Sequence, residues 1–291
     1  MDDTGNSSPG DVSGGNVADE LRIATLLAEA ARQQVSRLDA EVLLAALLRR
    51  GRAQLAAFPE SPVDALTAMM FRAGIDRVVD GEPLAYITGT REFWSLPLVV
   101  SPAVLVPRPE TELLVELCLA RLDHAPRRVA DLGTGSGAIA LALASERPQW
   151  TLVATDASAA ALEIAAINRQ RLQLPQVELR QGSWTGPLTE SFAAILSNPP
   201  YIAADHPALA TLRHEPTAAL VAADGGYADL LAIAAGSRAR LEPGGLLLLE
   251  HGSGQSARLA RELAALGYDG IRSHRDLAGH DRVTEAIWPR G

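Results

Sequence analysis

A carboxamide, two prolines and a phenol occupy residues 198–201, directly after an apolar run at 192–196. Asn198 Oδ1 and the backbone carbonyl of Pro199 are two acceptors, and each can take one N–H of a planar amino group. Prolines hold such acceptors rigidly, and Tyr201 can stack on a flat substrate. This arrangement predicts catalysis by orientation of a poorly nucleophilic nitrogen, without an Asp or His base. A Pro-rich turn after a buried strand is the alternative explanation of the same residues.

A glycine-rich loop lies between a predicted strand at 127–131 and a predicted helix at 136–146. Its residues are Gly133, Thr134, Gly135, Ser136 and Gly137. Glycines let the backbone turn sharply and approach a ligand, and the N-terminus of the following helix offers free amide donors. The loop therefore predicts a cradle for a nucleotide-like cofactor. The spacing also satisfies the relaxed dinucleotide fingerprint, so the loop by itself allows either a nicotinamide cofactor or S-adenosylmethionine.

Three further residues lie at the ends of predicted strands. Asp156 can accept hydrogen bonds from both hydroxyls of a cofactor ribose, and it could also cap the helix predicted at 158–173. Asp131 precedes the first glycine, where a carboxylate suits the cationic methionine part of S-adenosylmethionine better than a pyrophosphate. Trp184 ends the third strand and could pack on an adenine ring, although a lone Trp is more often a core residue. Electrostatics thus favours the sulfonium cofactor.

From residue 111 onward, helix and strand patterns alternate, which predicts a parallel sheet covered by helices. The predicted strands are 127–131, 151–155, 177–181, 192–197, 244–250 and 283–288, and the predicted helices are 136–146, 158–173, 227–241 and 255–266. A weak strand near 268–273 is too close to the last one for a crossover helix, so we expect an antiparallel edge hairpin. If the strand at 192–197 lies beside the one at 127–131, residues 198–201 adjoin the glycine loop.

The N-terminal part of the chain has a different character. Residues 1–17 are small, polar and acidic, and we expect a disordered tail. Leucines at helical spacing over 18–80 predict a bundle of three or four helices, one of them starting at Ser61 as N-cap. Residues 81–110 predict a linker with short strands, whose aromatic residues form either a contact surface or simple packing. The domain with the chemistry is then 111–291.

Composition limits the classes of function. The net charge is −9 and the sequence pI is near 5.2, which argues against a protein that binds nucleic acid mainly through phosphates. The single cysteine, Cys118, lies in an apolar helical pattern and is expected in the core. The six histidines have no metal-ligand spacing, so no metal site is expected. The N-terminus lacks the features of a secretory signal and no apolar run could span a bilayer, so we expect a cytoplasmic protein without membrane contact.

The glycine loop, Asp156 and the Asn-Pro-Pro-Tyr motif resemble those of class I methyltransferases that act on a planar amino nitrogen. Other segments resemble the HemK-type release factor glutamine methyltransferases in particular. These segments are Glu82–Gly89, Glu92-Phe93, Val106–Glu112, Glu215-Pro216, Ala219-Leu220, Asp224–Gly226 and Asp276–Arg282. The resemblance covers about residues 20–290, and its most specific part is Pro-Arg-Pro-Glu-Thr-Glu at 107–112.

The resemblance implies a Rossmann-like, mostly parallel seven-stranded sheet with an antiparallel edge hairpin, preceded by a small helical substrate-docking domain. It implies methyl transfer from S-adenosyl-L-methionine to N5 of the glutamine in the Gly-Gly-Gln motif of peptide chain release factors. The expected enzyme is a monomer whose partner is the release factor, with no direct contact to nucleic acid. The implied cofactor residues are Gly133, Thr134, Gly135, Ser136, Gly137, Asp156, Trp184 and Asn198. The implied substrate residues are Asn198, Pro199, Pro200 and Tyr201, of which Asn198 and Pro199 are catalytic.

Three rival functions share parts of this pattern. An N6-adenine DNA methyltransferase or an rRNA guanine methyltransferase would use the same tetrapeptide, and a basic stripe would favour it. A nicotinamide oxidoreductase would use the same glycine loop. A binding module without catalytic activity would only hold the release factor.

Overall fold

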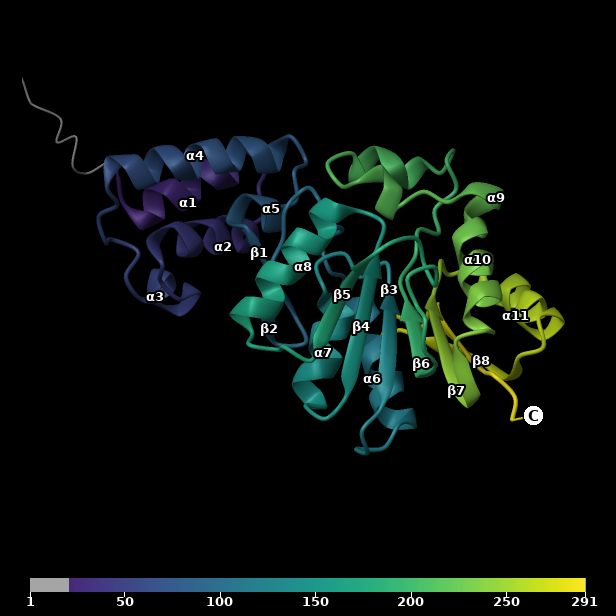
Figure 1. Cartoon of the computed structure of the whole chain (residues 1–291). Helices are drawn as coiled ribbons and strands as arrows, with labels where there is room; N and C mark the ends of the chain where they lie inside the picture. Colours follow the sequence, from purple (N-terminus) through teal and green to yellow (C-terminus); the bar gives the residue numbers. More distant parts are fainter. Residues whose placement is uncertain (1–20, 291) are drawn as a thin grey trace, which may run out of the picture. The chain divides into compact units, whose positions relative to one another are not determined.

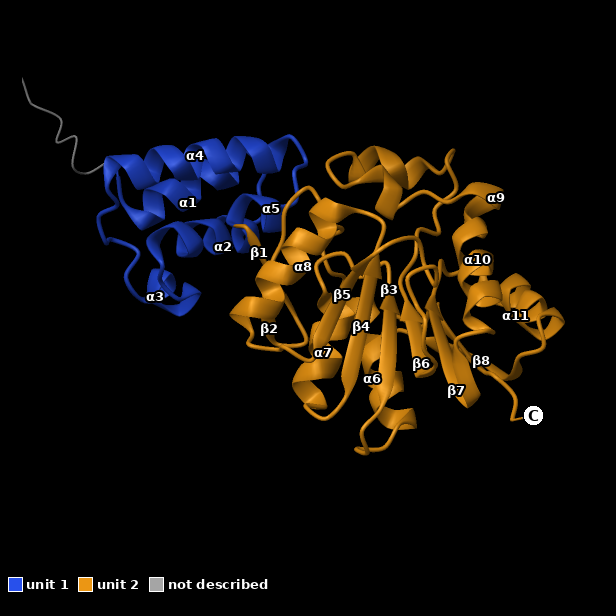
Figure 2. Ribbon diagram, viewed as in Figure 1, with its two compact units in different colours: residues 1–88 blue, residues 89–291 orange. Residues whose placement is uncertain are grey.

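The computed structural model describes residues 21–290 of the 291-residue chain. The predicted disordered tail at 1–17 lies outside the described residues, as do the first residues of the predicted helical bundle. The chain divides into two compact units, residues 1–88 (unit 1) and residues 89–291 (unit 2), which Figure 2 distinguishes by colour.

Unit 1 is helical throughout its described part. Its helices are α1 (Ile23–Arg32), α2 (Arg37–Leu48), α3 (Arg52–Ala57), α4 (Ala65–Val79) and α5 (Leu84–Thr88). One apolar core holds them together, with Leu26, Leu44 and Phe71 fully buried in it. The short helix α5 packs on α2 and α4, so unit 1 runs eight residues beyond the boundary predicted at residue 80.

The start of α4 differs from the sequence prediction. Asp64, not Ser61, is the N-cap, and its carboxylate accepts hydrogen bonds from the Thr67 backbone N at 2.9 Å and from the Thr67 hydroxyl at 2.6 Å. Pro62 forms an isolated bridge with Arg22 instead of opening the helix. Asp and Ser are both good N-caps, so the choice depended on the tertiary position of the chain before the helix.

Unit 2 contains a seven-stranded sheet, visible in Figure 1, with the strand order β5-β4-β3-β6-β7-β9-β8. The strands are β3 (Arg128–Leu132), β4 (Thr151–Asp156), β5 (Val177–Gln181), β6 (Phe192–Ser197), β7 (Leu241–Glu250), β8 (Asp269–Arg275) and β9 (Asp281–Ile287). The first five strands in this order are parallel, and β9 runs antiparallel between β7 and β8. The predicted parallel sheet with an antiparallel edge hairpin is confirmed.

Helices cover both faces of this sheet because neighbouring strand residues point to opposite sides. Val129 and Leu152 lie in the core beneath α6 (Glu112–Arg121) and α7 (Ala138–Glu146). Ala130 and Val153 lie in the core beneath α10 (Ala228–Ser237) and α11 (Ser256–Ala265). Buried side chains on both faces explain why the central strands read as continuous apolar runs in the sequence.

The segment that leads into the sheet forms a small hairpin of β1 (Thr90–Phe93) and β2 (Leu96–Val99). Phe93 is buried in the core, and Tyr86, in α5 of unit 1, is buried as well. Trp94 is half-buried, and its indole Nε1 donates to Glu146 Oε1 at 2.8 Å. The aromatic residues of this segment therefore pack inward, which supports the packing alternative over an aromatic contact surface.

Cys118 behaves as expected. It is fully buried in α6, and burial raises the pKa of its thiol to about 12. Within residues 21–290, no helix combines the length and the apolar character that crossing a membrane requires.

Candidate active site

The site lies where β3, β4 and β6 end, at the edge where the carboxyl ends of parallel strands meet. A cavity of about 370 Å³ opens there. Among the residues that line it are Thr111, Gly133, Thr134, Gly135, Ser136, Asp156, Trp184, Asn198 and Pro200. The structure thus brings together most of the residues predicted from separate motifs, although they come from several different strands and loops.

The glycine loop is held by the neighbouring strand β4. Gly133 N and Thr134 N both donate to the carbonyl of Thr155, at 2.8 and 2.9 Å. Gly133, Gly135 and Gly137 all have positive φ, the region that favours glycine. Gly135 lines the cavity, and nothing lies within 4 Å of the position its Cβ would take, so its backbone is open to a ligand. Gly137 is the N-cap of α7 and does not line the cavity.

Asp156 lines the cavity at the end of β4, as predicted. One carboxylate oxygen accepts from Gly135 N at 2.9 Å, and the other accepts from Ser158 N at 2.8 Å. The N-cap of α8 (Ala159–Arg171) is Ser158, whose hydroxyl accepts from Ala161 N, so Asp156 is not the cap. Each oxygen of Asp156 keeps a lone pair, so the side chain can hold the loop and still accept from a ligand hydroxyl.

Asp131 is fully buried and does not line the cavity. Its Oδ2 accepts from the Thr134 hydroxyl at 2.6 Å and from Ala140 N at 3.2 Å, whereas its Oδ1 has no hydrogen-bond partner. Burial raises the pKa of this carboxyl group to about 6. The carboxylate therefore lies behind the glycine loop. It holds the loop by the hydrogen bond from Thr134, and its negative charge can reach the cavity only through space.

Trp184 stands directly on the glycine loop. A Cβ added to Gly133 would lie only 2.9 Å from Trp184 Cζ3, so the indole requires glycine there. The side chain of Trp184 also donates a hydrogen bond to Asp229, which offsets part of the pKa increase that burial gives to this carboxyl group. The indole lines the cavity with one edge and packs on apolar residues with the rest.

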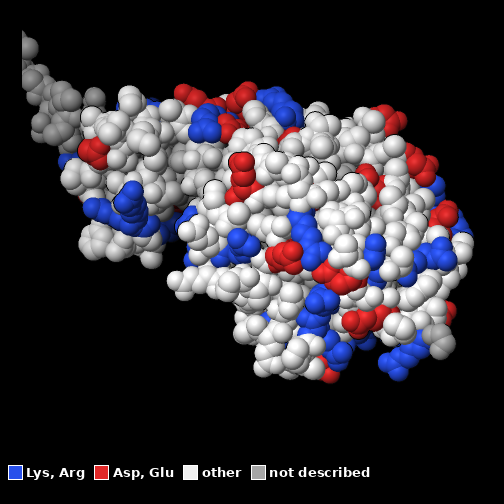
Figure 3. All heavy atoms as spheres, viewed as in Figure 1, with Lys and Arg blue, Asp and Glu red and all other residues white. Residues whose placement is uncertain are grey.

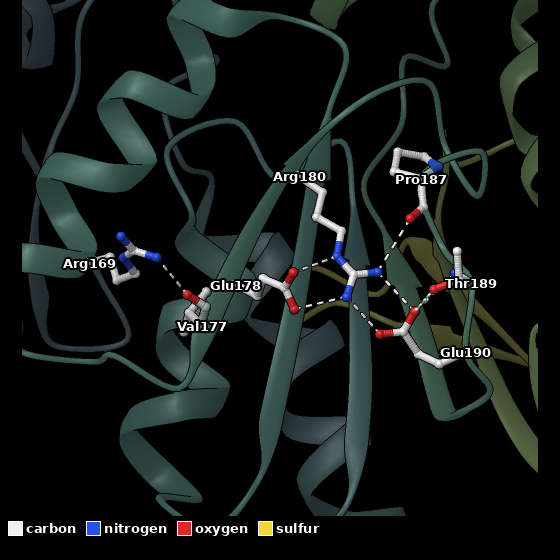
Figure 4. A network of polar contacts seen from close by, with 7 residues as sticks. All are labelled: Arg169, Val177, Glu178, Arg180, Pro187, Thr189 and Glu190. Carbon is white, nitrogen blue, oxygen red and sulfur yellow. Dashed lines mark hydrogen bonds and ion pairs between the residues drawn. The ribbon is translucent and has the colours of Figure 1, made fainter.

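The loop that carries Trp184 is braced by a charged network, drawn in Figure 4. Arg180 of β5 makes two hydrogen bonds of 2.8 Å to Glu178 and bonds of 2.7 and 2.9 Å to the two carboxylate oxygens of Glu190. Arg180 also donates to the carbonyl of Pro187 at 3.3 Å. The guanidinium group lowers the pKa of both carboxyl groups. This network ties the segment between β5 and β6 to the edge strand of the sheet.

The Asn-Pro-Pro-Tyr segment follows β6 directly. Asn198 and Pro200 line the cavity, whereas Pro199 and Tyr201 do not. Asn198 Nδ2 donates to Thr111 Oγ1 at 3.0 Å. No donor in the described part of the chain bonds the carbonyl oxygen of Pro199. The Tyr201 hydroxyl lies 3.4 Å from Glu250 Oε1, and burial raises the pKa of this phenol.

Comparison with known proteins identifies the family. Residues 106–222 match the model of the Methyltransferase small domain, and residues 21–89 match the PrmC N-terminal domain. A release factor glutamine methyltransferase of Escherichia coli is 47% identical over 251 residues, which are 85% of this chain and 91% of that protein. One from Xylella fastidiosa is 48% identical over 267 residues, which are 90% and 97% of the two chains.

The chain belongs to the release factor glutamine methyltransferase family.

Membership in this family decides between the two cofactors that the glycine loop allows, in favour of S-adenosylmethionine. The fold agrees. A Pyrococcus furiosus methyltransferase superposes with a TM-score of 0.53 at 18% identity, over 74% of this chain and 97% of that one. A 16S rRNA methyltransferase of T. thermophilus, solved with AdoMet and guanosine, gives 0.51 at 20% identity, over 68% and 49%. The seven-stranded class I methyltransferase fold is therefore confirmed.

Sequence reasoning missed several residues of the site that lie far away along the chain. Thr111 contacts Asn198 and Glu250 contacts Tyr201. Thr111 lies in the Pro-Arg-Pro-Glu-Thr-Glu segment of the resemblance, but neither residue was predicted as part of the site. Asn168 of α8 is fully buried, and its amide bonds the N and O of Val99 in β2 and the carbonyl of Ser136 in the glycine loop. An Asn inside an otherwise ordinary helix was the only available signal.

A second missed contact closes the rim of the cavity. Arg108 lines the cavity and pairs with the buried Glu215, whose other oxygen accepts from Val106 N at 3.1 Å. Arg108 belongs to the Pro-Arg-Pro-Glu-Thr-Glu segment that carries the family resemblance. Its partner Glu215 stood out in the sequence only through the family resemblance, because 107 residues separate the two.

The charges on the surface do not form a single-sign stripe in the view of Figure 3, where Arg, Asp and Glu interleave. Within residues 21–290, no group of three or more His, Cys, Asp or Glu residues is arranged to hold a metal ion.

Proposed function

We propose that this enzyme transfers the methyl group of S-adenosyl-L-methionine to N5 of the glutamine in the Gly-Gly-Gln motif of peptide chain release factors. Two observations support the proposal. Relatives at 45–48% identity over most of the chain are named release factor glutamine methyltransferase. The site also presents Asn198 in the cavity. The adjacent Pro199 does not line the cavity, but its carbonyl oxygen accepts no hydrogen bond from the described residues, and this pair of acceptors carries the chemistry.

The residues around the glycine loop fit the cofactor. Gly133 and Ser136 line the cavity and Gly135 offers an open backbone, Asp156 can accept from ribose hydroxyls, and the Trp184 side chain lies beside the loop. The buried carboxylate of Asp131 has one unpartnered oxygen, which places negative charge close to where a cation would lie. S-adenosylmethionine supplies an electrophilic methyl group when bound. These residues bind and orient it at the carboxyl edge of the sheet.

The second half of the site orients the acceptor. A glutamine amide is a poor nucleophile because its nitrogen lone pair is delocalised into the carbonyl group. Asn198 Oδ1 and Pro199 O can each accept one N–H, which keeps the amide nitrogen in a single orientation. Pro200 walls the cavity beside them, and Tyr201 supports the segment from behind through its contact with Glu250. Alignment of this kind is worth effective molarities of roughly 10⁵–10⁸ M.

No general base is required in this reaction. The nitrogen loses its proton readily once it has gained the methyl group, because its charge then rises. The proton passes to water, while Asn198 Oδ1 and Pro199 O hold the N–H bonds by hydrogen bonding only. The pair of acceptors therefore both positions the amide and stabilises the positive charge that develops on it.

We propose unit 1 as the part that docks the release factor. Six of the eight large apolar side chains that are exposed in residues 21–290 belong to this unit. Leu66, Met69 and Met70, here called the α4 patch, share one face of α4 because they are spaced by three and four residues. Flexible Met side chains suit a protein-binding surface. We also propose a cytoplasmic monomer that does not use nucleic acid, in keeping with the net charge of −9.

The substrate proposal is tested by transfer of a labelled methyl group. Purified release factor and the same factor with its loop glutamine replaced by alanine are each incubated with the enzyme and labelled S-adenosylmethionine. We expect label only in the unaltered factor, at that glutamine by peptide mass analysis. Equal labelling of the two factors would refute the substrate assignment, and label in DNA or rRNA instead would favour the nucleic-acid alternative.

A further inference from the structure

A buried polar pair, Thr111 and Glu250, lies beside Asn198, and Thr111 also lines the cavity. Thr111 ends the 3-10 helix η2 (Pro109–Thr111), and Glu250 ends β7. Thr111 is 4% exposed and Glu250 is 1% exposed. Thr111 Oγ1 accepts a hydrogen bond from Asn198 Nδ2 at 3.0 Å. Both residues are therefore shielded from water, and Thr111 contacts the amide of Asn198 directly.

The carboxylate group of Glu250 is bonded by few hydrogen-bond donors. Its Oε1 accepts from the Tyr201 hydroxyl at 3.4 Å. Its Oε2 has no hydrogen-bond partner. The Thr111 hydroxyl is nevertheless near enough to lower the pKa of this carboxyl group. Burial outweighs that effect and raises the pKa to about 7, with Arg282 lowering it and Glu110 raising it.

The direction of these bonds follows from how many hydrogens each group has. A Thr hydroxyl carries one hydrogen, and a carboxylate can only accept. Because Thr111 Oγ1 accepts from Asn198 Nδ2 at 3.0 Å, its own hydrogen points away from that amide, and the buried carboxylate of Glu250 is the nearby group able to attract it. Thr111 then presents only lone pairs to Asn198. Of the two ends of the Asn198 amide, only the NH₂ end can bond a lone pair. The carbonyl end, Oδ1, is then the one left for the substrate.

We propose that Thr111 and Glu250 are positioning residues, which set the direction of the Asn198 amide so that its oxygen faces the substrate nitrogen. The inference rests on the proposed function, because the oxygen matters there as an acceptor of a substrate N–H. Without this pair, the amide could turn by half a rotation and present its NH₂ to the substrate NH₂. Two donors would then face each other, and the substrate amide would lose one of its two acceptors.

The experiment compares four variants with the wild-type enzyme at pH 8.5, above the pKa of Glu250. Thr111→Val removes the hydroxyl at nearly constant shape, and Thr111→Ser restores it. Glu250→Gln keeps one acceptor but adds a donor. Thr284→Val is the matched control, since Thr284 is also a buried Thr, 1% exposed, whose hydroxyl bonds the ring of His251 at 2.9 Å and not Asn198. Steady-state methylation of release factor gives kcat and KM, calorimetry gives Kd for the cofactor, and thermal melts give Tm.

We expect Thr111→Val to lower kcat by about 10- to 100-fold, less than the roughly 10²–10³-fold for direct loss of a preorganised polar group, because Thr111 acts through Asn198. Its KM for release factor and its Kd for S-adenosylmethionine should stay within about threefold of the wild type. Thr111→Ser should recover kcat to within about threefold, and Glu250→Gln should fall between Thr111→Val and the wild type. Thr284→Val should lower Tm without lowering kcat.

Two results would overturn the inference. One is a kcat for Thr111→Val no lower than for Thr284→Val, and the other is a loss in Thr111→Val that Thr111→Ser does not recover. An unchanged kcat in Glu250→Gln would remove Glu250 from the pair. Each of these differs from failure of the proposed function, in which the wild-type enzyme itself would not label the glutamine of the release factor.

Discussion

The two units of this enzyme differ in where they keep apolar and polar groups. Unit 1 closes an apolar core and still leaves the α4 patch of Leu66, Met69 and Met70 exposed. Unit 2 buries nearly all of its large apolar side chains in two cores, and Ile167 and Leu277 are its exposed exceptions. Unit 2 instead buries many polar groups, and several of them lie near the carboxyl edge of the sheet, among them Asp131, Glu215 and Glu250.

This difference suggests a division of labour. An exposed apolar face is costly for a monomer unless a partner covers it, so it points to recognition of a protein. Buried polar groups are costly unless they are hydrogen-bonded, so they persist where chemistry needs them. Changes in unit 2 should therefore act on turnover, and changes in unit 1 should act on capture of the release factor.

The largest effect is expected for Asn198→Ala. This substitution removes one of the two acceptors for the substrate amide and leaves the glycine loop and Asp156 in place. We expect kcat to fall by about 10²–10³-fold, as for loss of one preorganised polar group in other enzymes. The Kd for S-adenosylmethionine should stay within about tenfold, since a single hydrogen bond contributes roughly 0.5–1.5 kcal/mol.

Single-turnover methylation and calorimetry measure these two quantities separately. A variant that turns over normally would show that Asn198 serves only to brace the scaffold. A variant that fails to bind the cofactor would move Asn198 from the substrate half of the site to the cofactor half.

A smaller effect is expected for the double substitution Met69→Gln and Met70→Gln in the α4 patch. Gln matches the length of Met but removes its apolar character, so docking on this face should weaken. We expect KM for the whole release factor to rise by about tenfold, which corresponds to about 1.4 kcal/mol. The kcat value should not change, nor should methylation of a short Gly-Gly-Gln peptide.

Ile167→Gln is the control for this prediction. Ile167 is exposed on α8 of unit 2, so the same chemical change is made outside unit 1. Equal KM values for the patch variant and this control would contradict the proposal that unit 1 docks the release factor. Unit 1 would then be a packing module.

The smallest effect on function is expected for Asp131→Asn, which should also change the pH dependence of stability. Burial raises the pKa of Asp131 to about 6, so the folded state binds its proton more tightly than the unfolded state. Stability is therefore lost as the pH rises from about 4 through about 6, at a cost on the order of 3 kcal/mol. Asn keeps an acceptor for Thr134 and Ala140 and does not ionise. Urea unfolding at pH 4–8 should show a flatter stability profile for the variant.

The same substitution tests the charge of Asp131 toward the cofactor. We expect the Kd for S-adenosylmethionine to rise by about three- to tenfold at pH 8, where the wild-type carboxyl group is ionised. The Kd for the uncharged product S-adenosylhomocysteine should rise less. Equal changes for the two ligands would indicate that Asp131 only supports the loop.

Much of this architecture could be predicted because it depends on local patterns. Alternating helix and strand periods predicted the parallel sheet, and a short distance between the last two strands predicted the antiparallel hairpin. The glycine loop and Asp156 lie at strand ends, where α/β folds bind ligands, so their place in the cavity also followed. In contrast, the N-cap of α4 and the end of unit 1 were missed, because several adjacent residues suit either role locally.

The sequence by itself determined the order of the elements, the motifs that meet at the edge of the sheet and the family to which the chain belongs. Only the tertiary structure decided what stands behind those motifs. Thr111 meets Asn198 across 87 residues of chain, and Tyr201 meets Glu250 across 49. Periodicity reports which face of an element is buried, but it carries no information on which distant polar groups share that burial. The direction of a hydrogen bond between them depends on the final packing of β6, β7 and η2.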